Sequence, residues 1–333
     1  MDERYERMME VGRGAFGVVW KAIDKQNGEV VAVKKLMEKY DSNNEYLILR
    51  EIKALKKLDN HPNIVKLKQV VKEQDDLYMV FEYMECSLYR SMVQRIKKPF
   101  SEDEIRDMCF QLFEGLAHMH RNKYFHRDLK PDNILVSGDV IKIGDLGSAR
   151  MFDDRFPYTD YITTRWYRAP EILLGSNNYE PSVDMWAMGA IMVELFTFEP
   201  LFKGSSEQDM IHKISRVLGT PTESTWNDGV RRAREINIQF PQFIGVEFSE
   251  LLPYASPDAV NLISSLLSWH PWGRPTALEA LQHPFFDNSN HVLRLRWHDS
   301  RDIASAKSNG RFVFRKAMER EQLKQQRRMN DWI

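Results

Sequence analysis

The stretch from His126 to Gly147 (HRDLKPDNILVSGDVIKIGDLG) contains the side chains best suited to phosphate chemistry. Asp128 and Asp145 supply carboxylates, and Asn133 supplies an amide oxygen. Oxygen ligands of this kind hold Mg²⁺, and a carboxylate can also accept a proton from a reacting hydroxyl. If these three side chains meet, they could act together on one phosphate.

Two apolar runs, residues 134–136 and 140–143, predict the element that brings these side chains together. Ser-Gly-Asp lies between the runs and predicts a turn, so the chain should reverse and return Asp145 to Asn133. Taken singly, each polar residue is more typical of a solvated turn, because Asp, Asn and Gly favour turns. The joint spacing, with Lys130 two residues after Asp128, favours a catalytic site instead.

This spacing of Asp128, Lys130, Asn133 and Asp145 resembles the catalytic and metal-binding pattern of the eukaryotic-type protein kinases. The resemblance implies an α+β, bilobal fold with a small β-rich N-lobe and a larger helical C-lobe. It predicts the N-lobe at residues 1–84 with a hinge at 82–86, the C-lobe at 87–286 with an insert at about 201–242, and a C-terminal extension at 287–333.

Composition agrees with a two-lobed protein. The chain has 333 residues, 43% of them hydrophobic, and its 47 basic and 48 acidic side chains leave a formal charge of −1. Such a balance predicts no general attraction to nucleic acid or membrane. Cys86 and Cys109 alone suggest no disulfide framework, and no run approaches the ~18 apolar residues of a membrane span. We expect a soluble intracellular monomer.

The glycine pattern Gly12, Gly14 and Gly17 is weak evidence by itself, because it also occurs in dinucleotide-binding folds. Those folds need a helix directly after the last glycine. Here residues 5–36 read as strands, with a hairpin turn at Asn27-Gly28. The order predicts a β-hairpin whose backbone N–H groups close over phosphates, with Phe16 at its tip.

Lys34 lies within an apolar strand, where an ammonium group needs a partner. Glu51, on a helix predicted from Tyr46 to Leu58, is the candidate. The alternative is that Lys34 and Lys35 are ordinary surface residues of a strand, which we retain for Lys35. The kinase resemblance implies that Lys34 holds the nucleotide phosphates when Glu51 pairs with it.

The nucleotide site is assigned by resemblance alone, since its residues would also suit a plain core. Glu82 and Met84 would contact adenine through their backbone, and Phe81 would close the back of the site. Ser87 stands where many relatives have an acidic or amide residue facing the ribose. The full set of predicted ATP-binding residues is Val11, Gly12, Gly14, Gly17, Val19, Ala32, Lys34, Phe81, Glu82, Met84 and Leu135.

Residues 145–171 read as a regulatory segment, in which Thr159 and Tyr161 flank one aspartate. Both hydroxyls are candidate phosphorylation sites, although an isolated tripeptide of this kind is usually an unmodified loop. The resemblance implies a phosphate-binding cluster on each side. Arg50, Arg127 and Arg150 would converge on Thr159, and Arg165 and Arg168 would lie near Tyr161. It also implies that Thr164 braces Asp128.

Further motifs indicate the branch of kinases. The text TTRWYRAPE at 163–171 and the insert resemble the CMGC group, and Thr-Asp-Tyr with Phe125 resembles the male-germ-cell-associated kinase (MAK/RCK-like) branch, close to the MAPK/MAK/MRK overlapping kinases. No cyclin-binding PSTAIRE text is present, so no cyclin partner is expected. Leu146 replaces the commoner Phe. By resemblance, Asp184 anchors the catalytic loop and Arg274 pairs with Glu171.

The resemblance implies a protein serine/threonine kinase that uses ATP and Mg²⁺. Asp128 would be the base, Lys130 would neutralise the γ-phosphate, and Asn133 and Asp145 would hold Mg²⁺. Lys34, Glu51 and Thr164 complete the predicted catalytic set. The kinase is expected to prefer protein substrates with a proline after the target residue, and to be activated by an upstream kinase. The expected location is the cytoplasm or nucleus, and the family resemblance suggests a cilium or flagellum. A scaffold pseudokinase and a metabolic phosphotransferase are the alternatives.

Overall fold

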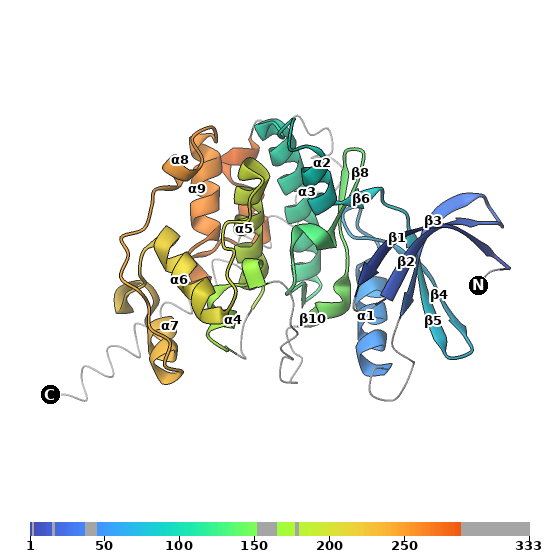
Figure 1. The fold of residues 1–333 in the computed structure, drawn as a ribbon, viewed down its shortest axis with the longest axis horizontal. Coiled ribbons are helices and arrows are strands. Elements are labelled where there is room, and N and C mark those ends of the chain that lie inside the picture. The colour runs from blue at the N-terminus through green and yellow to red at the C-terminus, as the bar shows by residue number, and fades with distance from the viewer. Residues whose placement is uncertain (2, 15–16, 37–44, 152–164, 177–179, 288–333) are drawn as a thin grey trace. The chain divides into compact units, whose positions relative to one another are not determined.

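The computed structural model describes residues 1, 3–14, 17–36, 45–151, 165–176 and 180–287. All of them belong to one compact unit, Met1–Ser289. It contains an antiparallel sheet in its N-terminal part and is mainly helical in its C-terminal part (Figure 1), which confirms the predicted α+β class. The division into 1–84, 87–286 and 287–333 stays a prediction. None of the described helices is long and apolar enough to cross a membrane.

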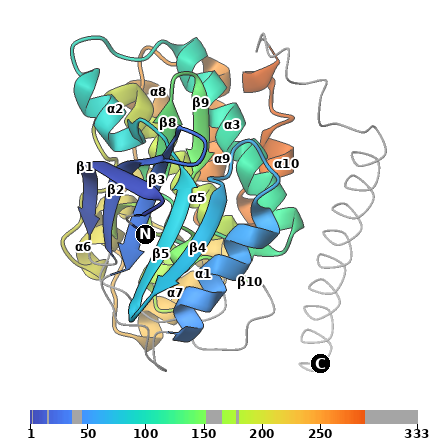
Figure 2. The same ribbon diagram turned by 90° about the vertical axis from the view of Figure 1, so that its right-hand side faces the viewer.

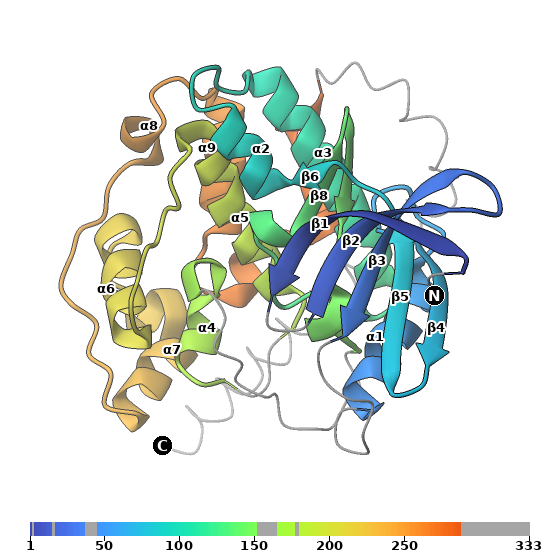
Figure 3. The same cartoon turned by 45° about the vertical axis from the view of Figure 1, so that its right-hand side comes forward.

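The N-terminal sheet has five strands in the order β1-β2-β3-β5-β4, side by side in Figure 3. The Asn27-Gly28 turn joins β2 to β3 as predicted, and Gly28 has a φ of 75°, which favours glycine. The apolar run from Leu77 to Met84 predicts a strand over its whole length, but β5 ends earlier, at Glu82, because the last pairing to β3 is Glu82 with Val31. The strands are β1 (Tyr5–Gly14), β2 (Gly17–Asp24), β3 (Glu29–Leu36), β4 (Leu67–Glu73) and β5 (Asp76–Glu82).

Helix α1 (Glu45–Leu58) lies against this sheet (Figure 2). Its buried residues Ala54, Leu55 and Leu58 share a core with Leu67 of β4 and Met79 of β5. The opposite face carries lysines, so the helix is amphipathic. This packing presents Glu51, one turn before Leu55, toward the interior of the protein.

Further strands support the catalytic stretch. The predicted hairpin is present as β8 (Ile134–Ser137) and β9 (Val140–Ile143), with Gly138 at a φ of 54° in the turn. In the three-stranded sheet, β6 (Cys86–Ser87) pairs with the other edge of β8. β7 (Tyr124–Phe125) pairs with β10 (Arg150–Met151), which brings the segments before and after the hairpin together.

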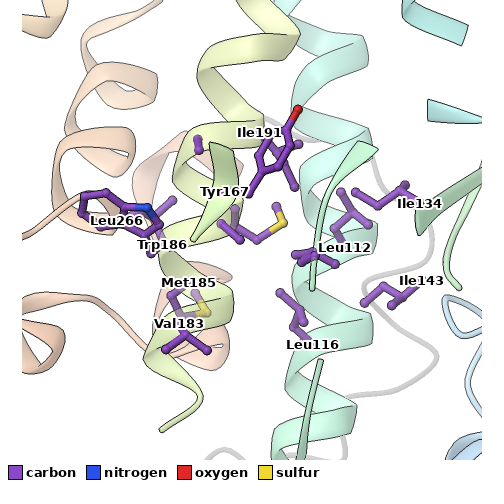
Figure 4. Packing of buried hydrophobic residues seen from close by; sticks show 14 of the residues in the cluster. Leu112, Leu116, Ile134, Ile143, Tyr167, Val183, Met185, Trp186, Ile191 and Leu266 are labelled. Atoms are coloured by element: carbon purple, nitrogen blue, oxygen red, sulfur yellow. The ribbon is translucent and has the colours of Figure 1, made fainter. Parts of the chain in front are cut away.

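Helices make up most of the C-terminal part. Figure 4 shows Leu112 and Leu116 of α3 facing Ile134 and Ile143 of the hairpin, and all four side chains are fully buried. Ser101 and Glu104 have the sequence spacing of a capping box, and the structure shows this capping box at the start of α3. The sequence also predicts a helix at 277–282, which in the structure ends at Ala280. The helices are α2 (Leu88–Gln94), α3 (Glu102–Arg121), α4 (Pro170–Leu173), α5 (Ser182–Thr197), α6 (Glu207–Leu218), α7 (Glu223–Glu235), α8 (Phe248–Leu251), α9 (Pro257–Leu266) and α10 (Ala277–Ala280).

Candidate active site

The loop between β7 and β8 gathers the first catalytic candidates. Lys130 Nζ lies 2.8 Å from Asp128 Oδ2, and Asn133 Nδ2 donates to the Asp128 carbonyl at 2.8 Å and to Oδ2 at 3.2 Å. Because the side-chain amide nitrogen of Asn133 bonds to Asp128, the side-chain amide oxygen of Asn133 is the atom suited to ligate a cation. The side chains of Asp128, Lys130 and Asn133 are therefore in contact, while their catalytic roles remain predictions.

Asp184, near the start of α5, anchors this loop through hydrogen bonds. Its carboxylate accepts the backbone N–H groups of His126 and Arg127 at 2.8 Å each, and it contacts His120 Nε2 at 3.0 Å. Burial would raise the pKa of Asp184, but the hydrogen bond from His120 and the nearby histidine charges outweigh burial and lower it. A buried carboxylate thus fixes the loop backbone, as the resemblance to protein kinases implies.

The β8–β9 hairpin brings the backbone directly before Asp145 into contact with Asn133. Ile134 pairs with Ile143, and Gly144 N–H donates to the Asn133 carbonyl at 2.8 Å. Asp145 follows in the left-handed region, at a φ of 50°. Asp145 is thus held one residue beyond the backbone hydrogen bond to Asn133, as the sequence predicted.

Lys34 of β3 reaches both acidic partners. Its Nζ lies 3.2 Å from Glu51 Oε1 and 4.0 Å from Asp145 Oδ1. Burial would lower the pKa of Lys34, but the charges of Glu51 and Asp145 and the hydrogen bond that Lys34 donates to Glu51 outweigh burial and raise the pKa above its usual value. Lys34 is therefore a cation between helix α1 and the β8–β9 hairpin.

Lys35, which we expected to be an ordinary surface residue, forms an ion pair of 2.5 Å with Asp76.

The segment after Asp145 packs directly beneath α1. Leu146 is fully buried, and a Cβ atom on Gly147 would stand 3.5 Å from Glu51 Oε2. Arg50 Nη2 donates to the Gly147 carbonyl at 3.3 Å. The position of α1 is therefore coupled to the segment that follows the predicted metal ligand.

The predicted ATP-binding residues lie on or next to strands of two different sheets. Gly14 pairs with Gly17. A Cβ atom on Gly17 would collide with the Lys35 carbonyl oxygen, so the close approach of β2 to β3 at this position requires glycine. Ser87 accepts from Arg90 N–H at 3.3 Å as the N-cap of α2. Val11 and Gly12 lie on β1, Gly17 and Val19 on β2, Ala32 and Lys34 on β3, Phe81 and Glu82 on β5, Met84 just after β5, and Leu135 on β8.

The arginines predicted to bind phosphate fall into two groups. Arg50 and Arg127 bond to adjacent carbonyls, those of Gly147 and Ser148, each at 3.3 Å, and Arg150 pairs with Phe125 in β10–β7. All three arginines therefore lie on or next to the segment that follows Asp145. Arg165 instead forms an ion pair of 2.5 Å with Glu207 of α6. Four predicted residues, Phe16, Thr159, Tyr161 and Thr164, lie outside the described residues, so the predictions for them, and for Arg165 and Arg168 beside Tyr161, stay predictions.

Two polar pairs, one buried and one half-buried, were not predicted from the sequence. Tyr167 donates to Glu194 Oε2 at 2.6 Å, and burial raises the pKa of Glu194 to about 7. Lys142 bonds to both carboxylate oxygens of Glu82, at 2.8 and 2.9 Å. Both pairs had a signal, because Glu194 and Lys142 are charged residues within apolar runs, as Lys34 is.

The donor set fits a cation that also binds phosphate. Within the part of the chain that the structure describes, no three or more His, Cys, Asp or Glu side chains gather as a complete metal site. Asp145 and Asn133 would instead provide two oxygen ligands. Mg²⁺ is commonly held by one or two protein oxygens, with phosphate oxygens and water completing its shell.

Comparison with known proteins agrees with this geometry. The family model described as "Protein kinase domain" matches residues 5–286. Similar proteins include "Cyclin-dependent kinase F-4" of Oryza sativa subsp. japonica, 56% identical over 87% of this chain and 63% of that protein. "Serine/threonine-protein kinase MAK" of Mus musculus is 48% identical over 85% of this chain and 45% of its own length, and "Serine/threonine-protein kinase ICK" of Rattus norvegicus is 46% identical over 89% and 47%. The chain spans between about half and two thirds of these relatives.

Proposed function

Because this chain belongs to the protein kinase family, in the branch of MAK and ICK within the CMGC group, we propose that it is a serine/threonine kinase. It would transfer the γ-phosphoryl group of ATP to serine or threonine hydroxyls of proteins. The relatives named as serine/threonine-protein kinases support this assignment over most of the chain. ATP and Mg²⁺ are the cosubstrate and the cation that the family generally uses.

The observation that carries the proposal is the ion pair between Lys34 and Glu51, with Asp145 on the same lysine. In a kinase this arrangement requires the helix and the metal-binding segment to be docked together. Asp128, Lys130 and Asn133 are also in mutual contact. No catalytic group of the described site is replaced, as it commonly would be in a scaffold.

Each described residue has a chemical task in the proposed reaction. Asp128 orients the substrate hydroxyl and accepts its proton, while Lys130 offsets negative charge on the transferred group. Lys34 holds the α- and β-phosphates. Asp145 and the amide oxygen of Asn133 would hold Mg²⁺, which, when bound, offsets phosphate charge and fixes the orientation of the phosphates. Phosphoryl transfer depends mainly on such positioning and electrostatics.

Regulation and partners form the finer part of the proposal. Phosphorylation of Thr159 by an upstream kinase would supply charge to Arg50, Arg127 and Arg150, and Tyr161 would be a second site. A phosphate makes about 1–3 charge-assisted hydrogen bonds, which is enough to order a segment. Substrates with proline after the acceptor, activity without a cyclin, a monomeric state and a cytoplasmic, nuclear or ciliary location follow from the family resemblance.

Mass spectrometry after incubation with Mg²⁺-ATP tests the function. The parent protein should phosphorylate peptides whose acceptor is Ser or Thr followed by Pro, whereas Lys34→Arg and Asp128→Ala should not. Lys68→Gln is the matched control, since Lys68 forms its ion pair with Glu29 away from the catalytic residues. The Asp128→Ala variant should still bind nucleotide. Turnover by Asp128→Ala at the parent rate would refute the assignment of Asp128 as the base. The scaffold alternative would be favoured if the parent binds nucleotide but stays inactive even after an added kinase has phosphorylated Thr159.

A further inference from the structure

The ion pair between Lys142 and Glu82 joins two strands that carry different parts of the proposed nucleotide site. Lys142 lies on β9 and Glu82 ends β5. The ammonium contacts both carboxylate oxygens at 2.8 and 2.9 Å, and the two side chains are only 14% and 24% exposed. Neither side chain has a role in the chemistry described above.

The strand register places this pair beside both walls of the site. Lys142 is directly opposite Leu135, so the two side chains lie on the same face of the β8–β9 hairpin. Glu82 pairs with Val31, and the next pair along these strands joins Phe81 and Ala32. Lys142 is therefore paired with a residue of one surface proposed to enclose adenine. Glu82 is one residue away from the other surface, with its side chain on the opposite face of the sheet from Phe81 and Ala32.

Glu82 is held rigidly by the backbone between these strands. Its Oε1 atom accepts Lys66 N–H at 2.7 Å, and its own N–H donates to the Lys66 carbonyl at 3.1 Å. One residue earlier, Val65 N–H donates to the Ile143 carbonyl at 2.9 Å. The carboxylate thus accepts from Lys142 and from a backbone segment that is itself bonded to β9.

Most ion pairs at a protein surface contribute little to stability, because solvent screens them and ordering the side chains opposes them. Lys142 and Glu82 differ in two respects. Both side chains are largely shielded, and the carboxylate accepts an additional backbone N–H. Removal of the lysine would leave a shielded carboxylate without its cation, which favours movement of the strand ends.

We propose that Lys142 is a positioning residue that fixes, through Glu82, the separation between the wall of the nucleotide site on β3 and β5 and the wall on β8. The inference rests on the proposed kinase function. It assigns Lys142 to nucleotide affinity and not to proton transfer, because Asp184 anchors the loop that carries Asp128. Removing the ammonium should weaken ATP binding and leave the chemical step nearly intact.

The experiment compares the parent with Lys142→Met, Lys142→Arg and the control Lys68→Met, whose lysine forms an ion pair of 2.6 Å with Glu29. Steady-state kinetics give kcat and the KM values for ATP and a Ser-Pro peptide, and calorimetry gives the Kd for Mg²⁺-ADP. For Lys142→Met we expect KM for ATP and Kd to rise about tenfold, which is the lower end of the range that corresponds to one hydrogen bond to a charged group. The kcat and peptide KM should stay within about twofold of the parent, which is the scale of a neutral surface change.

Lys142→Arg should restore most of the affinity, and Lys68→Met should match the parent. A lower kcat at unchanged KM for ATP, a rise in kcat, or equal effects of both methionine variants would overturn the inference. If Lys142→Met does not fold, judged by thermal unfolding, Lys142→Gln takes its place. A parent that binds ADP but transfers no phosphoryl group would refute the kinase function and leave the Kd comparison to decide, whereas a parent without nucleotide binding would overturn both.

Discussion

Replacement of Asp184 by asparagine should affect stability and turnover together. The side chain keeps its size but loses its charge, and one accepting oxygen becomes an NH₂ donor. In the structure that carboxylate faces three donors or ring nitrogens, those of His126, Arg127 and His120. An amide can satisfy the donors on one side, so at least one bond is lost and one N–H is left opposite another donor.

The size of the effect follows from these contacts. A hydrogen bond to a charged group contributes about 1.5–3 kcal/mol, and Asp184 is 1% exposed, so water cannot replace the lost bond. We expect the free energy of unfolding to fall by about 3 kcal/mol. For a domain of this size that corresponds to a fall in Tm of roughly 5–10 °C. The released loop also carries Asp128, and a displacement of about 1 Å at a reacting group costs roughly 100-fold in rate.

Differential scanning calorimetry and steady-state kinetics measure both effects. Asp228→Asn is the control, since Asp228 forms an exposed ion pair with Arg231 and should change the unfolding free energy by less than about 1 kcal/mol. An Asp184→Asn variant with a lower Tm but the parent kcat would refute the claim that Asp184 positions Asp128. Equal effects of the two asparagine variants would refute the claimed energy.

The same carboxylate has a definite pH signature. The pKa of Asp184 is lowered in the folded state, so its contribution to stability is present above its unfolded pKa of about 3.9. That contribution is lost as the pH falls through the folded pKa. The difference in Tm between parent and Asp184→Asn should therefore be constant near neutral pH and shrink below about pH 4. A difference that grows on acidification would contradict the direction of the shift.

Further predictions concern buried groups outside the catalytic loop. Burial raises the pKa of Glu194 to about 7, so the parent should lose about 2–3 kcal/mol of stability from about pH 4.5 to 7, and Glu194→Gln, which keeps an acceptor for Tyr167, should show a flatter profile in urea unfolding. Glu171→Gln should lower the unfolding free energy by about 3–5 kcal/mol, because it leaves buried Arg274 without its anion, and denaturant titration checks this. Leu146→Phe should cost about 1–3 kcal/mol in the same titration, since Leu146 is fully buried and a ring would overpack the site.

Local patterns in the sequence were sufficient for the parts of the fold that depend on local physics. The hairpin that returns Asp145 to Asn133 follows from two apolar runs around a turn, and the start of α3 follows from the capping box at Ser101. The Lys34–Glu51 pair was also predictable, because a charge in an apolar strand requires a partner and the kinase resemblance named it. In each case the sequence itself contains the signal.

The elements that were missed depend on partners far apart in the chain. Lys142 meets Glu82 across sixty positions, and Tyr167 meets Glu194 across twenty-seven. The charge in each apolar run was visible, but nothing local indicates which residue will face it after folding. The end of β5 at Glu82 has the same origin, because a strand ends where its neighbour stops pairing, and that neighbour, β3, is distant in sequence.

The site combines a short catalytic stretch with long-range support, and backbone strain shows why both are needed. Arg127 has a φ of 74° and Asp145 a φ of 50°, in a region that side chains other than glycine rarely adopt. Such residues cost of order 1–3 kcal/mol each and persist only when their surroundings hold them. Asp184 accepts the N–H of Arg127, and Gly144 bonds to Asn133 directly before Asp145. The local sequence therefore supplies the reactive groups, while α5 and the hairpin stabilise the conformation in which those groups meet.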